Sequence, residues 1–333
     1  MKNTNCRKKI LFLGLGGAGQ RHLRILSKYF DKNLFEFFAY RFKKKTPLLD
    51  SLFNPKKKEI QKEYAIKILS SFSEAVFLNP DVVFICTPSN IRYSLIKHFK
   101  QRNALICVEK PLASNLKEIN LIKKHIKIHK QKLKILFQRR FHPHNICTKK
   151  YISKKKIGNI FFVKFVSSSY LPDWHKYENF RELYAANKKM GGGIILTECH
   201  EIDLCILFFG SPIRHYVNLG SRKNYKLDVK DHAKIVLVYK DFNVLIELDF
   251  LNKKLEKSYI IYGSKGFIKS NQISNEYLLQ NYGNEKAIKF FSKITNEDLF
   301  LKQSRDIFDS TTNKKISIKN NIESSKIIAS MNR

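Results

Sequence analysis

Three stretches of the chain carry residues whose types and spacing can do chemistry. Near the start, "GLGGAG" places four glycines in six positions, after an apolar run and before a helical pattern. Glycine is costly in regular structure, so its clustering here serves either a phosphate group that approaches the backbone or an ordinary tight turn. Further along, "VEKP" contains Lys110 and "TECHEID" contains His200. These two side chains can bind a hydroxyl or carbonyl oxygen, and histidine can exchange its proton.

The glycine motif matches G-x-G-x-x-G in a context that is typical of dinucleotide binding. A strand is expected at "KILFLG", a helix at "GQRHLRILSKYF" and a second strand at "LFEFFAY". Gly14 permits the tight turn, Gly16 lets the backbone approach a pyrophosphate, and Gly19 lets the helix pack closely on the strand. The free N–H groups at the start of the helix then face the anion. We therefore expect this loop to bind the cofactor through Gly14, Gly16, Gly17, Ala18 and Gly19.

The end of the second strand, "AYRFKKK", bears on which dinucleotide binds. A site for NAD would hold an acidic residue about 20 positions after the motif, where it bonds the ribose hydroxyls. This chain has Tyr40 and Arg41 there, followed by three lysines. Arg41 can pair with a 2′-phosphate, which slightly favours NADP over NAD. Alternatively, Arg41 only stacks on the adenine, and either cofactor binds.

The elements that position these residues alternate between strand and helix. The runs "DVVFICTP" and "ALICVEKP" are apolar throughout, as strands buried on both faces should be. Helices are expected at "NIRYSLIKHF" and at "SNLKEINLIKKHIKIHK", the second capped by Ser114 or Asn115. "LKILFQRRF" is expected to be another strand. This rhythm predicts an α/β fold with a parallel sheet, a Rossmann dinucleotide-binding domain over residues 1–140.

From about Gly158 the pattern changes. "IFFVKFVSSSY", "HAKIVLVYK", "FNVLIELDF" and "SYIIYGSKGFIK" are expected strands separated by short turns, and several alternate apolar and polar residues. Such alternation predicts a mostly antiparallel sheet with one exposed face. We assign it to a second α/β domain, residues 141–333.

Composition narrows the classes of function. The formal charge is +35, but the lysines are spread along all 333 residues, and no zinc-finger spacing, RNP-like motif or basic region with heptads is present. We interpret the charge as solvated surface, with attraction for acidic ligands as an alternative, and expect no nucleic-acid partner. No apolar run has the length of a membrane span and no secretory signal is evident, so a cytoplasmic protein without a membrane partner is expected. The six cysteines include no CxxC pair, which favours reduced thiols over disulfides or zinc, and no metal site is expected.

From about Ile10 to at least Phe267, the chain resembles the Gfo/Idh/MocA oxidoreductases, the glucose-fructose oxidoreductase and inositol dehydrogenase family. The motifs that carry the resemblance are, in order, "GLGGAGQRHL", "PDVVFICTPSN", "VEKPLA", "RFHP", "GGGIILTECHEID" and "YGSKGFI". The resemblance implies an NAD(P)-binding Rossmann domain and a second domain with a large open sheet. That sheet usually packs against another subunit, so a homo-dimer or homo-tetramer is expected. It also implies hydride transfer between a nicotinamide and a secondary hydroxyl or ketone of a sugar, sugar derivative or cyclitol, with surface-glycan synthesis as one setting.

The resemblance also implies roles for single residues. Lys110 would bond a substrate hydroxyl or polarise the carbonyl it becomes, and a cis bond before Pro111 would fix the turn that aims it. His200 would be the general acid/base, with Asp203 orienting it, capping the helix or pairing with a surface lysine. A solvated lysine and a structural histidine are the alternatives. The implied cofactor-binding residues include Thr87, Pro88, Glu109 and Lys110, and the substrate-side residues are Arg140, Trp174, Tyr184, Thr197, His200 and Asp203.

Some of these assignments have a second interpretation. The aromatic residues and the arginine of "YLPDWHKYENFRELYAANKK" suit a sugar ring with an acidic substituent, or they serve packing. Many family members have an aspartate before the histidine, where this chain has Thr197 and, out of phase, Glu198. Threonine can bond a substrate but is a poor base. Arg92 stands where a histidine is common, and it is expected to add a positive group near the cofactor. The missing aspartate keeps open a non-catalytic or regulatory dinucleotide-binding protein.

Overall fold

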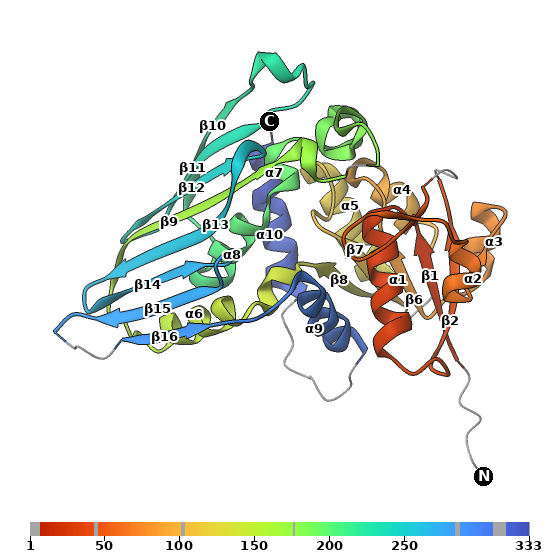
Figure 1. Ribbon diagram of the computed structural model, residues 1–333, viewed down its shortest axis with the longest axis horizontal. Coiled ribbons are helices and arrows are strands. Elements are labelled where there is room, and N and C mark those ends of the chain that lie inside the picture. Colours follow the sequence, from red (N-terminus) through yellow and green to blue (C-terminus); the bar gives the residue numbers. More distant parts are fainter. Residues whose placement is uncertain are drawn as a thin grey trace, which may run out of the picture. The chain divides into compact units, whose positions relative to one another are not determined.

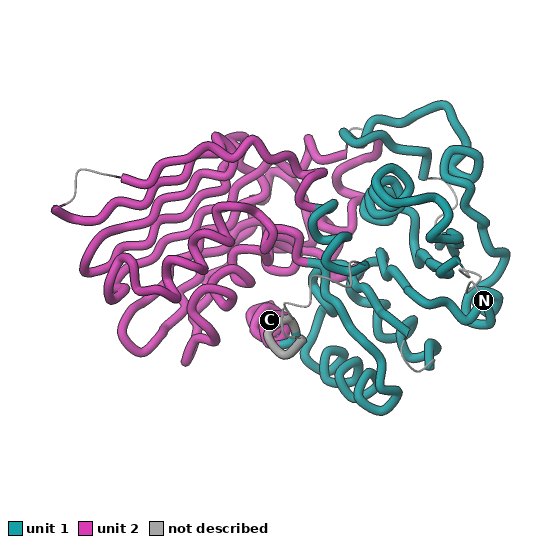
Figure 2. Tube along the Cα trace, turned by 90° about the horizontal axis from the view of Figure 1, so that it is seen from below, with its two compact units in different colours: residues 1–136, 300–322 teal, residues 137–299, 323–333 magenta. Residues whose placement is uncertain are grey.

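The computed structural model describes residues 7–42, 46–100, 104–175, 177–283, 287–308 and 318–332. The chain divides into two compact units, which Figure 2 colours separately. Unit 1 comprises residues 1–136 and 300–322, and unit 2 comprises residues 137–299 and 323–333. The domain limits expected from the sequence, 1–140 and 141–333, stay a prediction, because compact packing alone does not define a domain.

Unit 1 is built on a six-stranded sheet in which all neighbouring strands are parallel. Its order is β5-β2-β1-β6-β7-β8, which reverses direction between β1 and β6. Open α/β sheets bind ligands beyond the carboxyl ends of their strands at such a switch point. The strands are β1 (Lys8–Leu13), β2 (Phe35–Tyr40), β5 (Lys67–Ile68), β6 (Val82–Ile85), β7 (Leu105–Glu109) and β8 (Lys132–Leu136).

Helices bury both faces of this sheet. Consecutive residues of a strand point to opposite faces, and in β1 every residue from Ile10 to Leu13 is fully buried. Helix α1 contributes Leu23 and Leu26 to the core, and α5 begins where the Asn115 side chain accepts a hydrogen bond from the Glu118 N–H at 3.0 Å. The expected cap is therefore confirmed. The other elements are α1 (Gly17–Tyr29), β3 (Leu48–Leu49), β4 (Pro55–Lys56), α2 (Ile60–Tyr64), α3 (Phe72–Phe77), α4 (Arg92–Ile96), α5 (Leu116–Ile128) and α9 (Asn296–Phe308), the last beginning in unit 2.

Unit 2 contains an eight-stranded sheet in the order β10-β11-β12-β9-β13-β14-β15-β16 (Figure 1). Every neighbouring pair is antiparallel except β12 and β9, which are parallel. The expected combination of a parallel Rossmann sheet and a mostly antiparallel second sheet is thus confirmed. The strands are β9 (Ile160–Tyr170), β10 (Arg214–Gly220), β11 (His232–Val238), β12 (Asn243–Asp249), β13 (Leu251–Gly263), β14 (Gly266–Asn271), β15 (Glu276–Asn281) and β16 (Ile288–Phe291).

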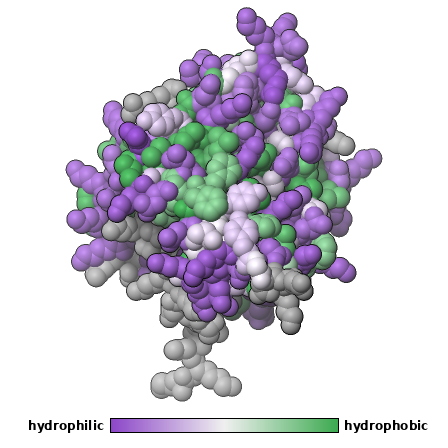
Figure 3. Space-filling view, turned by 90° about the vertical axis from the view of Figure 1, so that its left-hand side faces the viewer, coloured by the Kyte–Doolittle hydropathy of each residue, from purple (hydrophilic) through white to green (hydrophobic). Residues whose placement is uncertain are grey.

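The helices of unit 2 pack on one face of this sheet and leave the other open (Figure 1). Phe165, Ile246 and Ile261 point to the helical face and are 0–1% exposed. On the open face, Phe162 is 41% and Tyr216 is 56% exposed. Figure 3, which looks at this side, shows apolar side chains gathered among polar ones. The helices are α6 (Pro143–Ser153), α7 (Ile194–Thr197), α8 (His200–Phe209) and α10 (Ile318–Met331), the last ending in unit 2.

One predicted strand is shorter than the sequence indicates. The strand expected over "LKILFQRRF" ends at Leu136, and Gln138–Phe141 forms a 3₁₀ turn. The cause is non-local, because Arg139 and Arg140 turn inward to bind acidic residues of α8. None of the described helices is both long and apolar enough to cross a membrane.

Candidate active site

The glycine loop lies between β1 and α1 and leaves its backbone accessible. Gly14 has φ +94°, which few other residues adopt, and a Cβ on Gly19 would lie 2.1 Å from the Gly14 carbonyl oxygen. The turn and the close packing expected of these two glycines are therefore present. A Cβ on Gly16, by contrast, would meet no atom within 4 Å. The backbone beside Gly16 thus faces open space, at the start of a helix whose first residues are Gly17 and Ala18.

This loop fits the phosphate groups of a dinucleotide. No side chain caps α1, and its first turn contains no acidic residue. The N-terminus of a 13-residue helix therefore presents N–H groups and the positive end of its dipole. At the end of the neighbouring strand β6, Thr87 is 5% exposed and its hydroxyl oxygen has no hydrogen-bond partner within the described chain. Such an unsatisfied polar atom beside Pro88 is consistent with a bound polar ligand.

Arg41 follows β2, at the position where the sequence predicts contact with the adenosine end of the cofactor. One of its terminal nitrogens donates to the Thr46 carbonyl at 2.6 Å, whereas Nε is buried without a partner among the described residues. Burial lowers the pKa of this guanidinium from its ordinary value. The three lysines that follow, residues 43–45, lie outside the described residues. The bond to Thr46 therefore fixes the Arg41 side chain, and its Nε–H is a hydrogen-bond donor without a partner among the described residues.

Lys110 lies just beyond the carboxyl end of β7, which neighbours β6. The bond between Lys110 and Pro111 is cis, as expected. Arg92 is 4% exposed, and it donates to the Thr87 carbonyl at 3.0 and 2.8 Å and to the carbonyls of Glu109 and Pro111. Arg92 therefore ties the ends of β6 and β7 together, and the positive group that it was expected to add near the cofactor stays a prediction.

Glu109, the residue before Lys110, points into the protein. Its carboxylate lies 2.7 Å from Nε2 of His22 on α1. Burial opposes ionisation of Glu109, but the bond to His22 and the charges of His22, Lys110 and Arg92 hold its pKa below the ordinary value. The His22–Glu109 pair was not found from the sequence. The only local signal was a histidine within the buried stripe of α1, three residues after Gly19 and one turn before Leu26.

In unit 2, the triple glycine brings α7 and α8 close to the preceding segment. A Cβ on Gly192 would lie 2.2 Å from the Tyr184 carbonyl oxygen, so only glycine fits there. Ile194, the first residue of α7, donates to the Lys230 carbonyl at 2.9 Å. His200 opens α8, is 5% exposed, and packs edge-on against Phe137 at 6.0 Å between ring centroids.

Two buried ion pairs anchor the first turn of α8. Nε of Arg140 donates to Asp203 at 2.8 Å, with a second contact between the same side chains, and Arg139 pairs with Glu201. Arg140 and Asp203 are 6% and 1% exposed. The sequence predicts that both residues bind the substrate, and in the structure their side chains bind each other. They therefore hold the helix that carries His200.

The position of the family aspartate is apolar or neutral in this chain. Thr197 ends α7 and is 1% exposed, and the buried Glu198 accepts a hydrogen bond from Ser167 on β9 at 3.3 Å. The structure thus directs this carboxylate toward the sheet. Trp174 packs edge-on against Phe250, with ring centroids 6.4 Å apart, and is partly buried, as is Tyr184.

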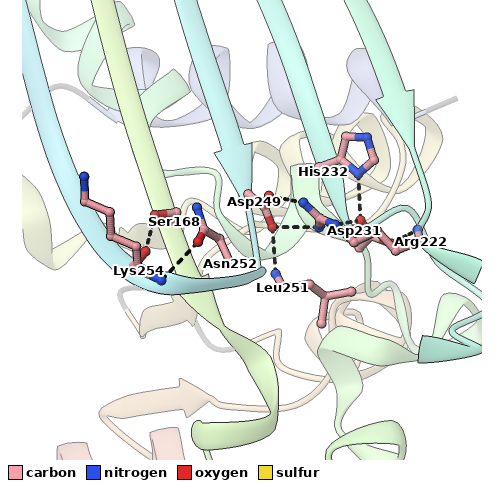
Figure 4. Close-up of polar contacts among 8 residues, drawn as sticks. All are labelled: Ser168, Arg222, Asp231, His232, Asp249, Leu251, Asn252 and Lys254. Carbon is pink, nitrogen blue, oxygen red and sulfur yellow. Dashed lines mark hydrogen bonds and ion pairs between the residues drawn. The ribbon is translucent and has the colours of Figure 1, made fainter. Parts of the chain in front are cut away.

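A polar network crosses the end of the sheet next to this segment (Figure 4). Arg222 donates to Asp249 at 3.0 Å and to Asp231 at 3.1 Å, and Asp231 also lies 2.7 Å from Nδ1 of His232. Asp249 in turn accepts from the Leu251 N–H at 2.8 Å. The network fixes the loop between β10 and β11, and Lys230 of this loop accepts the hydrogen bond from Ile194 at the start of α7. Its members come from β11, β12, the start of β13 and the loop before β11, and they were missed by sequence reasoning.

Comparison with known proteins decides the family. Residues 8–137 match the model of an oxidoreductase family with an NAD-binding Rossmann fold, and residues 147–269 match the GFO/IDH/MocA C-terminal domain. The chain belongs to the Gfo/Idh/MocA oxidoreductase family. The expected resemblance is confirmed, and unit 1 carries the NAD-binding fold of the family.

Individual relatives are more distant. Inositol 2-dehydrogenase of Rhizobium meliloti (strain 1021) is 33% identical over 87 residues, 26% of either chain. The uncharacterized oxidoreductase YrbE of Bacillus subtilis (strain 168) is 24% identical over 160 residues, 47% of this chain and 44% of the relative. The matches therefore span less than half of either curated relative. Levoglucosan dehydrogenase in complex with NADH superimposes with a TM-score of 0.80 at 15% identity, covering 98% of this chain and 96% of that one, which shows a shared fold.

Proposed function

We propose that this family member transfers a hydride between a nicotinamide cofactor and a secondary hydroxyl or ketone of a sugar, sugar derivative or cyclitol. The observation that carries the proposal is the placement of Lys110. It follows β7, two strands from the open glycine loop at the end of β1 and next to the strand that ends in Thr87. This is the edge of the sheet where a dinucleotide lies in Rossmann folds. The names of the inositol and levoglucosan dehydrogenases support a polyol substrate.

The two candidate catalytic residues divide the proton chemistry. When bound, the nicotinamide supplies the acceptor or donor of the hydride. His200 takes the hydroxyl proton of the substrate during oxidation and returns it during reduction. The Lys110 ammonium donates a hydrogen bond to the same oxygen and stabilises the negative charge that develops there. Thr197 can orient a substrate hydroxyl, while Arg140 and Asp203 act indirectly by holding α8.

Binding of the cofactor can be tested without knowing the substrate. We expect NADH or NADPH to bind the wild-type chain, and Gly16→Asp to abolish binding without unfolding the protein. The added carboxylate would occupy the open space beside the backbone and repel the pyrophosphate. Calorimetry with a circular dichroism control measures both effects. Unchanged affinity in folded Gly16→Asp protein would contradict the assignment of the loop.

The choice between cofactors is proposed to favour NADP slightly. The position after β2 holds Arg41 rather than a carboxylate, and its buried Nε has no hydrogen-bond partner among the described residues. We expect NADPH to bind at least as tightly as NADH, and Arg41→Asp to shift preference toward NADH by removing the cation and adding a ribose acceptor. Arg41→Gln is the control for loss of charge alone. A strong preference of the wild type for NADH would refute the proposal.

Turnover decides between the enzyme and its alternative. Oxidation should be followed by the absorbance of reduced nicotinamide, with a panel of inositols, hexoses, anhydrosugars and nucleotide sugars. Turnover of one of these supports the dehydrogenase, and it must be lost in Gly16→Asp protein. Cofactor binding without turnover of any of them supports the second function, a regulatory dinucleotide-binding protein, which the absence of the family aspartate favours. A cytoplasmic location and a role in surface-glycan synthesis stay predictions.

A further inference from the structure

A cluster of buried polar groups lies at the carboxyl ends of β6 and β7 in unit 1. The side chains of His22 and Glu109 are 0% and 12% exposed, and they meet at 2.7 Å. Arg92 comes from α4 and binds the carbonyls of Glu109 and Pro111. The residues on either side of Lys110 are therefore held by polar side chains from two different helices.

This arrangement is costly for a purely structural role. A buried ion pair often contributes less to stability than apolar residues of the same volume. Moreover, Nδ1 of His22 is buried without a hydrogen-bond partner in the part of the chain that the structure describes, and an unsatisfied buried polar atom is destabilising. Phe84 and Phe300 pack against the imidazole, with ring centroids at 5.2 and 5.4 Å. An aromatic hydrocarbon ring would suit these neighbours better than an imidazole does.

The charge of Glu109 is the property that an apolar pair would lack. Three groups face or adjoin this carboxylate, namely His22 from α1, Arg92 from α4 and Lys110 beside it in sequence, and together they keep it ionised despite its burial. Its field reaches the end of β6, where burial and, after it, the Glu109 charge raise the pKa of the Cys86 thiol. A lasting negative charge therefore lies one residue from Lys110.

We propose that His22 is a positioning residue that keeps the Glu109 carboxylate charged and turned inward, where it offsets Lys110 and Arg92 and favours the oxidised nicotinamide over the reduced one. The inference rests on the proposed function, because it requires the nicotinamide to lie near the end of β7. The oxidised ring carries a positive charge that the reduced ring lacks, so only the oxidised form gains from a nearby carboxylate. The ratio of the two affinities therefore reports this charge.

The test compares both redox forms of the cofactor on two variants of the full chain. Glu109→Gln removes the charge at nearly constant shape. His22→Phe keeps the packing on Phe84 and Phe300 but removes the hydrogen-bond donor. Dissociation constants for NAD⁺, NADH, NADP⁺ and NADPH are measured by calorimetry. We expect each variant to weaken the oxidised form about 5- to 30-fold more than the reduced form, as one charge acting through a partly screened interior would. A ten-fold change in this ratio equals about 30 mV in the potential of the bound cofactor.

His22→Gln is the matched control, because its amide retains an N–H donor for Glu109, and it should keep the ratio within about two-fold of wild type. The double variant His22→Phe/Glu109→Gln should shift the ratio no further than Glu109→Gln alone, since both act through one charge. An unchanged ratio, or an equal loss of both forms, in folded Glu109→Gln protein overturns the inference and leaves the proposed function intact. Wild-type protein that binds no nicotinamide cofactor overturns both.

Discussion

At the scale of single residues, the candidate catalytic groups are few and differ in their surroundings. Lys110 is partly exposed at the end of β7, whereas His200 is 5% exposed at the start of α8. Two carboxylates near His200 in the sequence could take part in the same proton transfer, but both bind other groups of the protein. Asp203 binds Arg140, and Glu198 accepts a hydrogen bond from the sheet. We therefore assign proton transfer in the proposed reaction to Lys110 and His200.

We accordingly expect Lys110→Met and His200→Ala to lose about 10²–10⁴-fold in turnover while still binding cofactor, because a positioned acid or base acts mainly in the transition state. Their effects should be less than additive, since both serve one proton transfer. Thr197→Ala is the comparison, and it should cost less because a threonine only orients the substrate. Steady-state kinetics on whichever sugar or cyclitol is turned over give these values. Near wild-type turnover by His200→Ala would remove the histidine from the mechanism.

At the scale of elements, α6 is joined to the sheet of unit 2 by hydrogen bonds as well as apolar packing. His144 of α6 is fully buried, with Nδ1 2.8 Å from the Ser270 hydroxyl and Nε2 3.0 Å from that of Ser292. Thr148, one turn further along α6, bonds the hydroxyls of Tyr259 and Tyr277. Burial lowers the pKa of His144 to about 4 from its ordinary 6.5. The folded protein thus holds this imidazole neutral.

We therefore expect the stability of unit 2 to decrease as the pH is lowered, because the folded protein holds His144 neutral. Below about pH 6.5, His144 of the unfolded chain binds a proton, whereas His144 of the folded chain stays neutral down to about pH 4. Between pH 7 and pH 5 this removes up to about 2 kcal/mol from the free energy of unfolding. His144→Gln should be less stable at pH 7 but lose less on acidification. Trp174, the one tryptophan of the sequence, lies in unit 2, so its fluorescence in urea follows this unfolding. Equal losses in the two proteins would contradict the role of His144.

Local sequence patterns predicted those features of the fold and site that depend on neighbouring residues. The apolar strands, the turn at Gly14 and the cap at Asn115 are set by residues within a few positions of each other. Patterns of this kind could not show that Arg140 pairs with Asp203, 63 residues away, or that His22 pairs with Glu109, 87 residues away. Buried partners of this kind are chosen by tertiary packing, which also ends β8 earlier than its apolar pattern suggests.

At the scale of the whole molecule, the open face of the eight-stranded sheet is the surface that suits a second copy of the chain. Aromatic rings line part of it, with Phe162 6.2 Å and Phe267 5.8 Å from Tyr262 between ring centroids. A sheet with one solvated face usually alternates apolar and polar residues, and a cluster of exposed aromatic rings on that face is a feature that interaction surfaces share. The homo-dimer or homo-tetramer expected from the sequence stays a prediction, and these rings are the part of the sheet on which we test it.

We expect Tyr262→Arg to convert the assembled protein into monomers. In an interface formed by the same face of two copies, the substitution introduces two like charges into an apolar contact, and burying them without partners is unfavourable. Phe77→Arg is the matched control, because Phe77 is 86% exposed on α3, which belongs to unit 1 and not to the sheet of unit 2, and the variant should assemble like the wild type. Sedimentation velocity at micromolar concentrations measures the mass of each protein, with cofactor binding as a check that the variants fold. A monomeric wild type, or a Tyr262→Arg protein that assembles as the wild type does, would place the subunit contact elsewhere or exclude it.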